Sequence, residues 1–232
     1  MEASPGYLGE AATVAPRISE LIPNAKLLFI LRDPVERLYS SYNFHKGRLD
    51  IDKKIHFENY VDKCLAFDRG EADADELGLG EWYLKMLRFG CYAEYIRNYN
   101  AYFAGDQVKI MFFEQFTSDI SGFMKELSIF LRIDINFWDN YEFRKTNVTF
   151  SGSNKMLHRA AITVNNRLER VLRQRPRLKH ALVRLYKMIN QAREGYDPMP
   201  ASANETLKLY YRPHNEALRK LLGKEHLPGW SC

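Results

Sequence analysis

A short apolar run followed at once by a turn is the feature that most constrains the fold of this chain. Residues 27–31 are all apolar, a length that favours a buried strand over a helix. Asp33 then suits a helix N-cap, and Pro34 suits the first helical position, where its missing N–H costs nothing. Residues 26–42 therefore predict a strand, a sharp turn and a helix, with Arg32 at the strand's carboxyl end and Ser40 about two turns along the helix.

The polar residues of this unit are candidates for binding an anion. Ligands bind at the carboxyl ends of strands in open α/β sheets. The guanidinium of Arg32 offers a fork of donors that matches phosphate oxygens, and the hydroxyl of Ser40 can add another donor. The alternative is structural: Arg32 pairs with a carboxylate, Ser40 faces solvent, and Asp33 pairs with Arg37 at the i,i+4 spacing. The spacing alone leaves both interpretations open.

The stretch RDPVERLYSSY, residues 32–42, resembles a known nucleotide-binding motif. It matches R-D-P-x-x-R-x-x-S-x-Y, which holds the 3′-phosphate of the donor in sulfotransferases that use PAPS (3′-phosphoadenosine-5′-phosphosulfate). The match is closest to the glycan-modifying and bacterial branch. The resemblance implies that Arg32 and Ser40 bind the 3′-phosphate of PAPS. It therefore favours the anion-binding interpretation of these residues over the structural one.

The following segments predict a second strand–helix unit. A helix at 90–103 precedes a strand at 107–113 and a helix near 120–131, an order that also resembles the family. For Glu114, at the strand's end, structural capping is the favoured role, and the tyrosines of the 90–103 helix are expected to pack in the core and at its rim. The fold class is thus α/β, a parallel sheet flanked by helices in a P-loop-NTPase-like sulfotransferase fold. We expect one domain over 1–232, with a nucleotide-binding core at 1–150 and a helical part at 151–232.

One part of the family pattern has no counterpart in these residues. Family members hold the 5′-phosphosulfate with a loop of the form P-K-x-[GA]-[TS]-[TS], upstream of an E-x-[ST]-P-x-Y segment. Here the latter segment is at 2–7, with Ala3 where several members have a lysine. The sequence therefore predicts an N-terminally truncated domain that lacks this loop, and the catalytic residues are left unassigned.

Two further basic residues are candidates for the donor site. In the family, a segment after the last core helix closes over the nucleotide, and by loose similarity Arg144 and Lys145 are proposed as additional PAPS-binding residues. No metal site is expected. The acidic stretch 68–81 lacks the spacing of a calcium loop and is predicted to be a solvated loop, and the three cysteines lie far apart.

The charge of the chain is concentrated in one segment. Residues 155–193 carry eleven Lys or Arg against one acid, a balance of +10, which leaves −5 for the rest of a chain whose net charge is +5. A docked helix with a solvated positive face is the simpler interpretation of this basic arm. Binding of a polyanion such as an acidic glycan is the alternative, while nucleic acid is not expected because no motif for it is present.

The chain is long enough, at 232 residues and 46% hydrophobic, for one large core. No apolar run suits a membrane span, and the first residues do not resemble a signal peptide. We therefore expect the cytoplasm for a bacterial protein and the Golgi lumen for a eukaryotic fragment, with the cytoplasm preferred. The sequence does not predict the oligomeric state.

Two functional hypotheses remain at this stage. The first is a PAPS-dependent sulfotransferase that acts on a hydroxyl or amine, expected on a carbohydrate. The second is a non-catalytic protein of the same fold that binds a nucleotide or a polyanion. A nucleotide kinase is the weaker third option, because no Walker-type glycines are present.

Overall fold

The computed structural model describes residues 2–4, 6–143 and 197–231, together with residues 150–151, 167–168, 175, 182 and 193–194. The chain divides into two compact units. The first contains residues 1–41, 55–142 and 199–232, and the second contains residues 42–54 and 143–198. All of the candidate site that the structure describes belongs to the first unit.

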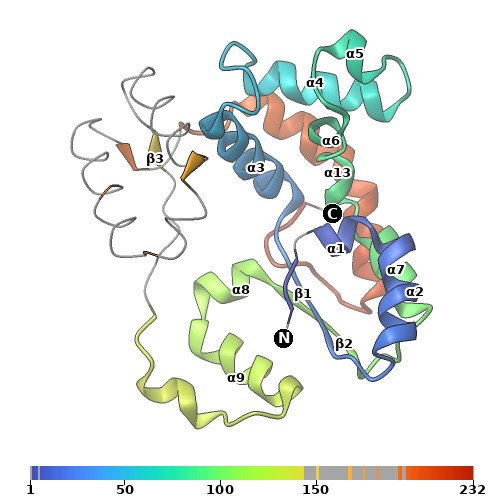
Figure 1. Cartoon of the computed structure of the whole chain (residues 1–232), viewed down its shortest axis with the longest axis vertical. Coiled ribbons are helices and arrows are strands. Elements are labelled where there is room, and N and C mark those ends of the chain that lie inside the picture. The colour runs from blue at the N-terminus through green and yellow to red at the C-terminus, as the bar shows by residue number, and fades with distance from the viewer. Residues whose placement is uncertain are drawn as a thin grey trace. The chain divides into compact units, whose positions relative to one another are not determined.

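A parallel pair of strands lies at the centre of the first unit. β1 (Leu27–Leu31) pairs with β2 (Val108–Phe112) in a register that places Leu27 opposite Val108 and Leu31 opposite Phe112. The strands run side by side in Figure 1. Parallel neighbours need a long crossover connection, here supplied by the helices between residues 31 and 108. The predicted strands and the α/β class are confirmed.

One face of this sheet packs against three helices. They are α2 (Ala11–Leu21), α7 (Tyr92–Asn100) and α13 (Ala201–Leu221). Alternate strand side chains point to this face because successive residues of a strand face opposite sides. One core cluster joins Leu31 and Phe112 to Tyr92 and Trp230. A second cluster, around Tyr99, joins the start of the strands to α2.

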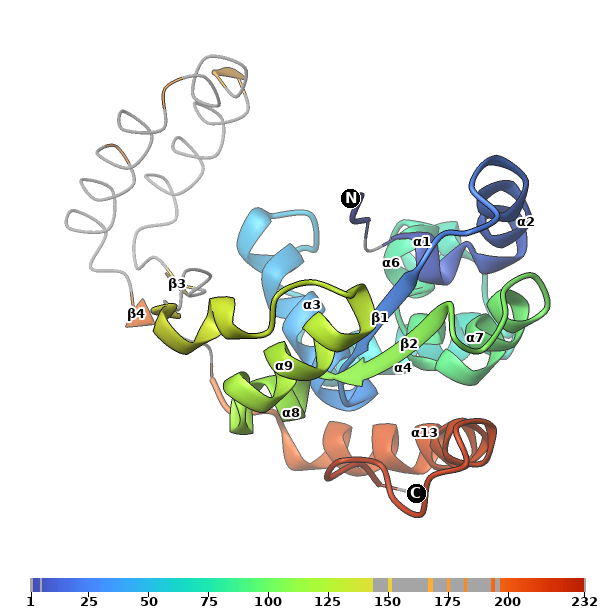
Figure 2. The same cartoon turned by 90° about the horizontal axis from the view of Figure 1, so that it is seen from below.

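Two further helices lie on the other side of the strands. They are α8 (Phe113–Ser118) and α9 (Ile120–Leu131), opposite α2 and α7 in both Figure 1 and Figure 2. Lys109 in β2 pairs with Glu126 in α9 at 2.5 Å. Ile30 nevertheless keeps 51% of its surface exposed. The prediction of a buried strand is therefore met only at Leu31, while residues 27–29 are half-buried and Ile30 is left uncovered by the helices on this side.

Short elements complete the first unit: α1 (Gly6–Gly9), α4 (Phe57–Asp68), α5 (Ala74–Leu77), α6 (Glu81–Leu84), η1 (Arg88–Gly90) and η2 (Asn136–Asn140). The acidic segment 68–81 is not wholly a loop as predicted, because α5 forms inside it. Asp73 accepts a hydrogen bond from the Glu76 N–H at 2.9 Å, and the Glu76 carboxylate accepts one from the Asp73 N–H at 3.0 Å. This reciprocal capping box stabilises a single helical turn.

α3 (Pro34–Arg48) begins in the first unit and ends in the second. In the second unit, β3 (Phe150–Ser151) pairs antiparallel with β4 (Arg193–Glu194), and His45 contacts Asp50 at 2.9 Å. Most of the basic arm lies outside the described residues. The expected division at residue 150 stays a prediction, although α13 is grouped with the strands in the first unit.

Candidate functional site

The peptide unit between Arg32 and Asp33 follows β1, and side chains bond both of its polar groups. Tyr92 Oη, from α7, donates to the Arg32 carbonyl oxygen at 2.8 Å. The Asp33 N–H donates to Glu114 Oε1 at 2.7 Å, and Glu114 lies in the first turn of α8, directly after β2. The carboxyl ends of the two parallel strands are therefore joined through this peptide.

Asp33 caps α3 as predicted. Its Oδ1 accepts from the Val35 N–H at 2.8 Å and from the Glu36 N–H at 3.2 Å. Burial raises the pKa of Asp33 above its ordinary value, although these two N–H groups act in the opposite direction. The carboxylates of Glu114 and Glu36 also raise this pKa. The cap orients the first turn of α3 relative to β1.

The guanidinium of Arg32 contacts Glu36 and Phe113. Its Nη2 lies 3.4 Å from Glu36 Oε2, and its Cζ lies 5.2 Å from the centre of the Phe113 ring. The side chains of Arg32 and Glu36 are 30% and 54% exposed, and a long i,i+4 pair in this setting contributes little stability. Arg32 is thus available to a stronger anion.

Ser40 is half-buried in α3 and lies one helical turn after Glu36. Its hydroxyl makes no hydrogen bond to any residue that the structure describes. Residues four apart on a helix lie on the same face. Because Glu36 contacts Arg32 and shares a face with Ser40, both predicted phosphate-binding residues border the same side of the start of α3.

The predicted ion pair between Asp33 and Arg37 does not form. Arg37 is half-buried and donates instead to the carbonyl oxygen of Met86. The side chain of Arg37 also lies near Tyr211, whose Oη donates to the Leu87 carbonyl oxygen at 2.7 Å. The helix turns Arg37 toward the loop at 86–87, whereas Asp33 is occupied by the cap. Sequence spacing does not reveal that this face of α3 is covered.

Gly90 and Tyr92 both lie against the segment that begins α3. A Cβ atom at Gly90 would lie 2.7 Å from both Pro34 Cβ and Tyr211 Cε1. The glycine therefore lets the start of α3 approach α13 closely. Tyr92 is buried, as predicted, and Tyr102 is 49% exposed. The hydrogen bond from Tyr92 to the Arg32 carbonyl oxygen was not predicted from the sequence.

Cys91, Glu94 and His214 form the one group in the described part of the chain with the composition of a metal site. Their ligand atoms lie within 4.8 Å of one another. Arg88 Nη2, however, already donates to Glu94 Oε2 at 2.7 Å, which places a cation against the carboxylate. Burial raises the pKa of the Cys91 thiol to about 12 and lowers the pKa of His214. We assign the group to an ion-pair network.

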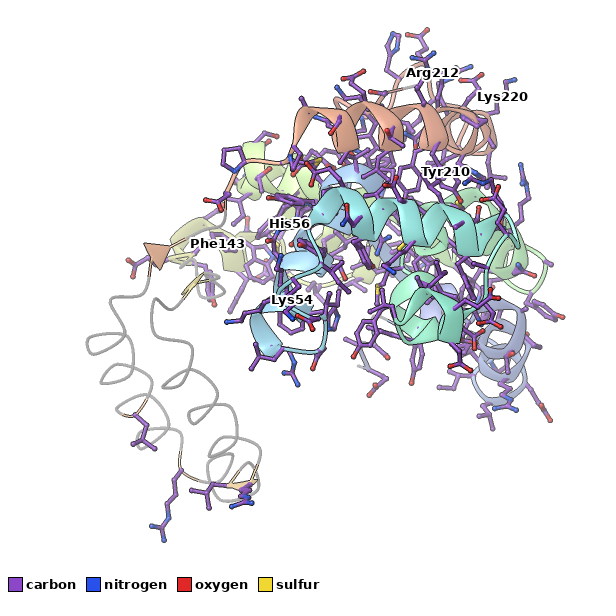
Figure 3. The ribbon with its side chains drawn as sticks, turned by 90° about the horizontal axis from the view of Figure 1, so that it is seen from above. Lys54, His56, Phe143, Tyr210, Arg212 and Lys220 are labelled. Carbon is purple, nitrogen blue, oxygen red and sulfur yellow. The ribbon has the colours of Figure 1, made fainter. Side chains whose placement is uncertain are left out.

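This network extends to α4 through Tyr210. Tyr210 Oη donates to Asp68 Oδ2 at 2.9 Å, and Figure 3 shows Tyr210 between α13 and α4. Arg88 also contacts Asp68, at 3.4 Å. These hydrogen bonds and ion pairs link α4, α7 and α13. Arg144 and Lys145, the other predicted binding residues, lie outside the described residues.

The family of the chain follows from a comparison with known proteins. The family model described as "Sulfotransferase domain" matches residues 16–195. The chain belongs to the sulfotransferase domain family. The matched region includes Arg32, Ser40, Tyr92 and Glu114, so the observed geometry is that of a sulfotransferase domain.

Relatives of this sulfotransferase domain include enzymes named for glycan sulfation. The chain is 27% identical over 225 residues to mouse bifunctional heparan sulfate N-deacetylase/N-sulfotransferase 4, covering 92% of the chain and 21% of that protein. It is 32% identical over 120 residues to rat carbohydrate sulfotransferase 15, covering 48% of the chain and 21% of that protein. The chain thus spans about a fifth of the length of these curated relatives.

A solved structure shows the same fold. The sulfotransferase from Alicyclobacillus acidocaldarius matches with a TM-score of 0.60 and 20% identity, covering 97% of the chain and 65% of that protein. Within the described residues, no helix combines the length and the apolar character needed to cross a membrane. The predicted sulfotransferase fold is therefore confirmed.

Proposed function

We propose that this domain transfers a sulfuryl group from PAPS to a carbohydrate acceptor, with Arg32 and Ser40 holding the 3′-phosphate of the donor. The observation that carries the proposal is the position of Arg32, partly exposed at the carboxyl end of β1 and held only weakly by Glu36. A guanidinium and a hydroxyl on the same side of a helix start supply suitable donors for a phosphate.

The chemistry of the proposed transfer defines what else is needed. The bond between sulfur and the bridging phosphate oxygen breaks, a bond from sulfur to the acceptor oxygen or nitrogen forms, and adenosine 3′,5′-bisphosphate leaves. The acceptor's proton passes to a base, for which we name no residue. Arg144 and Lys145 are included in the proposal as additional donor-binding residues; unchanged nucleotide affinity after replacing both would remove them from it.

The acceptor class is supported by the relatives. One of them is named a heparan sulfate N-deacetylase/N-sulfotransferase, and another is named a carbohydrate sulfotransferase. We therefore propose a polysaccharide with free amino or hydroxyl groups as the acceptor. Transfer of radiolabelled sulfate from PAPS to N-deacetylated heparan chains tests this directly. Binding of the nucleotide without any transfer to a panel of glycans would instead favour a non-catalytic nucleotide-binding role.

Calorimetry can test the nucleotide site itself. Adenosine 3′,5′-bisphosphate should bind more tightly than adenosine 5′-phosphate, which lacks the 3′-phosphate. Loss of a charge-assisted hydrogen bond in Arg32→Ala should cost ~1.5–3 kcal/mol for the bisphosphate and little for the monophosphate. Ser40→Ala should show a smaller loss of the same kind. Equal affinities for the two nucleotides in the wild-type protein would contradict the proposal.

A matched control is available on α13. Arg212 is exposed on this helix, and Figure 3 shows its side chain pointing away from the ribbon. The Arg212→Ala variant removes the same charge from the protein without touching the proposed site. It should bind both nucleotides as the wild-type protein does, which separates a local contact from a general effect of net charge.

A further inference from the structure

The peptide unit that carries Arg32 into α3 is held from two directions. Tyr92 Oη bonds its carbonyl oxygen at 2.8 Å, and Glu114 Oε1 bonds its N–H at 2.7 Å. The anchors lie 60 residues and 81 residues away along the chain, on separate elements. A peptide plane bonded at both polar groups cannot rotate without breaking a hydrogen bond. Fixing this plane fixes ψ of Arg32 and φ of Asp33, and with them the position of Arg32 relative to the start of α3.

The use of Glu114 as the acceptor carries a free-energy cost that stabilising the start of α3 would not by itself require. Glu114 Oε2 is buried and has no hydrogen-bond partner among the described residues. A buried carboxylate oxygen without a donor is unfavourable. A neutral side chain could accept the same N–H with less penalty. The position of the acceptor, directly after β2, therefore points to a geometric role.

The residue before Glu114 contacts the other end of Arg32. The Phe113 ring centre lies 5.2 Å from Arg32 Cζ, a distance suited to a cation–π interaction. Phe113 and Glu114 are the first two residues of α8. The end of β2 thus supports both the backbone and the guanidinium of Arg32, while the buried Tyr92 holds the carbonyl from α7.

We propose that Tyr92 and Glu114 are positioning residues that orient Arg32 toward the 3′-phosphate of the nucleotide, with Phe113 supporting the guanidinium. This inference rests on the proposed function. A bidentate contact to phosphate depends on the direction of the guanidinium, and sites of this kind need geometry held within about 0.5 Å. The two anchors therefore determine selectivity for the 3′-phosphate, without touching the nucleotide themselves.

The decisive measurement is the ratio of affinities for adenosine 3′,5′-bisphosphate and adenosine 5′-phosphate. Tyr92→Phe and Glu114→Ala should each weaken binding of the bisphosphate by roughly 3- to 30-fold, a range typical of coupled neighbours. Binding of the monophosphate should stay within about twofold, because it does not use Arg32. Glu114→Gln keeps an acceptor for the Asp33 N–H and should restore most of the ratio.

Tyr95→Phe is the matched control. Tyr95 lies in α7 like Tyr92, and its hydroxyl also donates to a backbone carbonyl, that of Arg88, at 3.1 Å. Removing this hydroxyl should leave the affinity ratio unchanged. If Tyr95→Phe lowered the ratio as much as Tyr92→Phe, loss of any α7 hydroxyl would explain the effect, and the positioning role would be overturned.

Repeating both substitutions in the Arg32→Ala background separates the possible outcomes. If the anchors act through Arg32, neither substitution should lower the ratio further there. A further fall of the affinity ratio in the Arg32→Ala background would overturn the positioning role. Equal losses of affinity for the two nucleotides in the otherwise wild-type protein would overturn it too. If Arg32→Ala alone leaves the ratio unchanged, the proposed function fails instead. If Glu114→Ala does not fold, the same measurement can still be made on Tyr92→Phe, because this variant keeps the buried ring.

Discussion

Glu114 accepts the N–H of Asp33 at 2.7 Å, a hydrogen bond that connects the end of β2 to the end of β1 across 81 residues of sequence. The bond involves Asp33, which also caps α3 and which directly follows Arg32, the residue that we propose binds phosphate. The geometry of the turn between β1 and α3 therefore depends on the pairing of two strands that are distant in sequence.

Removing the charge of Glu36 should strengthen nucleotide binding. Glu36 is the carboxylate that contacts Arg32, at 3.4 Å, and a bound phosphate would compete with it. Exposed pairs of this kind contribute up to about 1 kcal/mol, so Glu36→Gln should tighten binding of adenosine 3′,5′-bisphosphate by up to about fivefold. Calorimetry at low salt measures the change. Weaker binding in Glu36→Gln would show that the carboxylate assists the site.

Adding a methyl group at Gly90 should destabilise the fold. The new Cβ would meet Pro34 and Tyr211 at 2.7 Å, closer than packed atoms allow. Forcing extra volume into a packed core costs about 1–3 kcal/mol. Denaturant unfolding of Gly90→Ala should show this loss. Gly105→Ala is the control, because a Cβ there meets nothing within 4 Å, and equal losses in both variants would contradict the packing argument.

Removing the hydroxyl of Tyr211 should also lower stability. Tyr211 is buried and donates to the Leu87 carbonyl oxygen at 2.7 Å. Tyr211→Phe removes the donor from this carbonyl oxygen, at a cost of about 1–3 kcal/mol in the free energy of unfolding. Tyr102→Phe, at a residue that is 49% exposed, should change it little. A loss of similar size at Tyr102 would argue against a specific role for the buried hydroxyl.

The stability of the domain should depend on the protonation of His214. Burial lowers the pKa of His214 in the folded protein below its ordinary value of 6.5, while Glu94 and Asp68 raise it and Arg88 lowers it further. The unfolded chain therefore takes up a proton first as the pH falls. This group's contribution to stability is present above about pH 6.5 and is lost as the pH falls through the folded pKa.

Unfolding measured from pH 8 to pH 5 tests this dependence. The difference in unfolding free energy between the wild-type protein and His214→Gln should shift in favour of the variant as the pH falls. His226→Gln, at an exposed position, serves as the matched control. A difference that shifts in favour of the wild-type protein on acidification would mean that His214 gains a proton on folding, contrary to the expected direction.

Local sequence signals predicted much of the site. The apolar run at 27–31, the N-cap at Asp33 and Pro34 at the first helical position located β1, the turn and the start of α3. The helix at 120–131 was predicted with the observed bounds. These features depend on residues within a few positions of one another, so they can be recognised without knowing the fold.

Other predictions failed where local rules met tertiary packing. The expected pair of Asp33 with Arg37 is one case, because Arg37 donates instead to the carbonyl oxygen of Met86. A helical spacing shows which residues can meet, and the neighbouring elements decide which of them do.

The sequence by itself determined the strand, the turn, the helix start and the motif that contains Arg32 and Ser40. Only the tertiary structure decided how Arg32 is presented, because its peptide is bonded by Tyr92 from α7 and by Glu114 from the end of β2. Strand pairing and helix packing bring these groups together across 60 and 81 residues. Such contacts arise from the burial of apolar faces on several elements at once, so no single stretch of sequence encodes them.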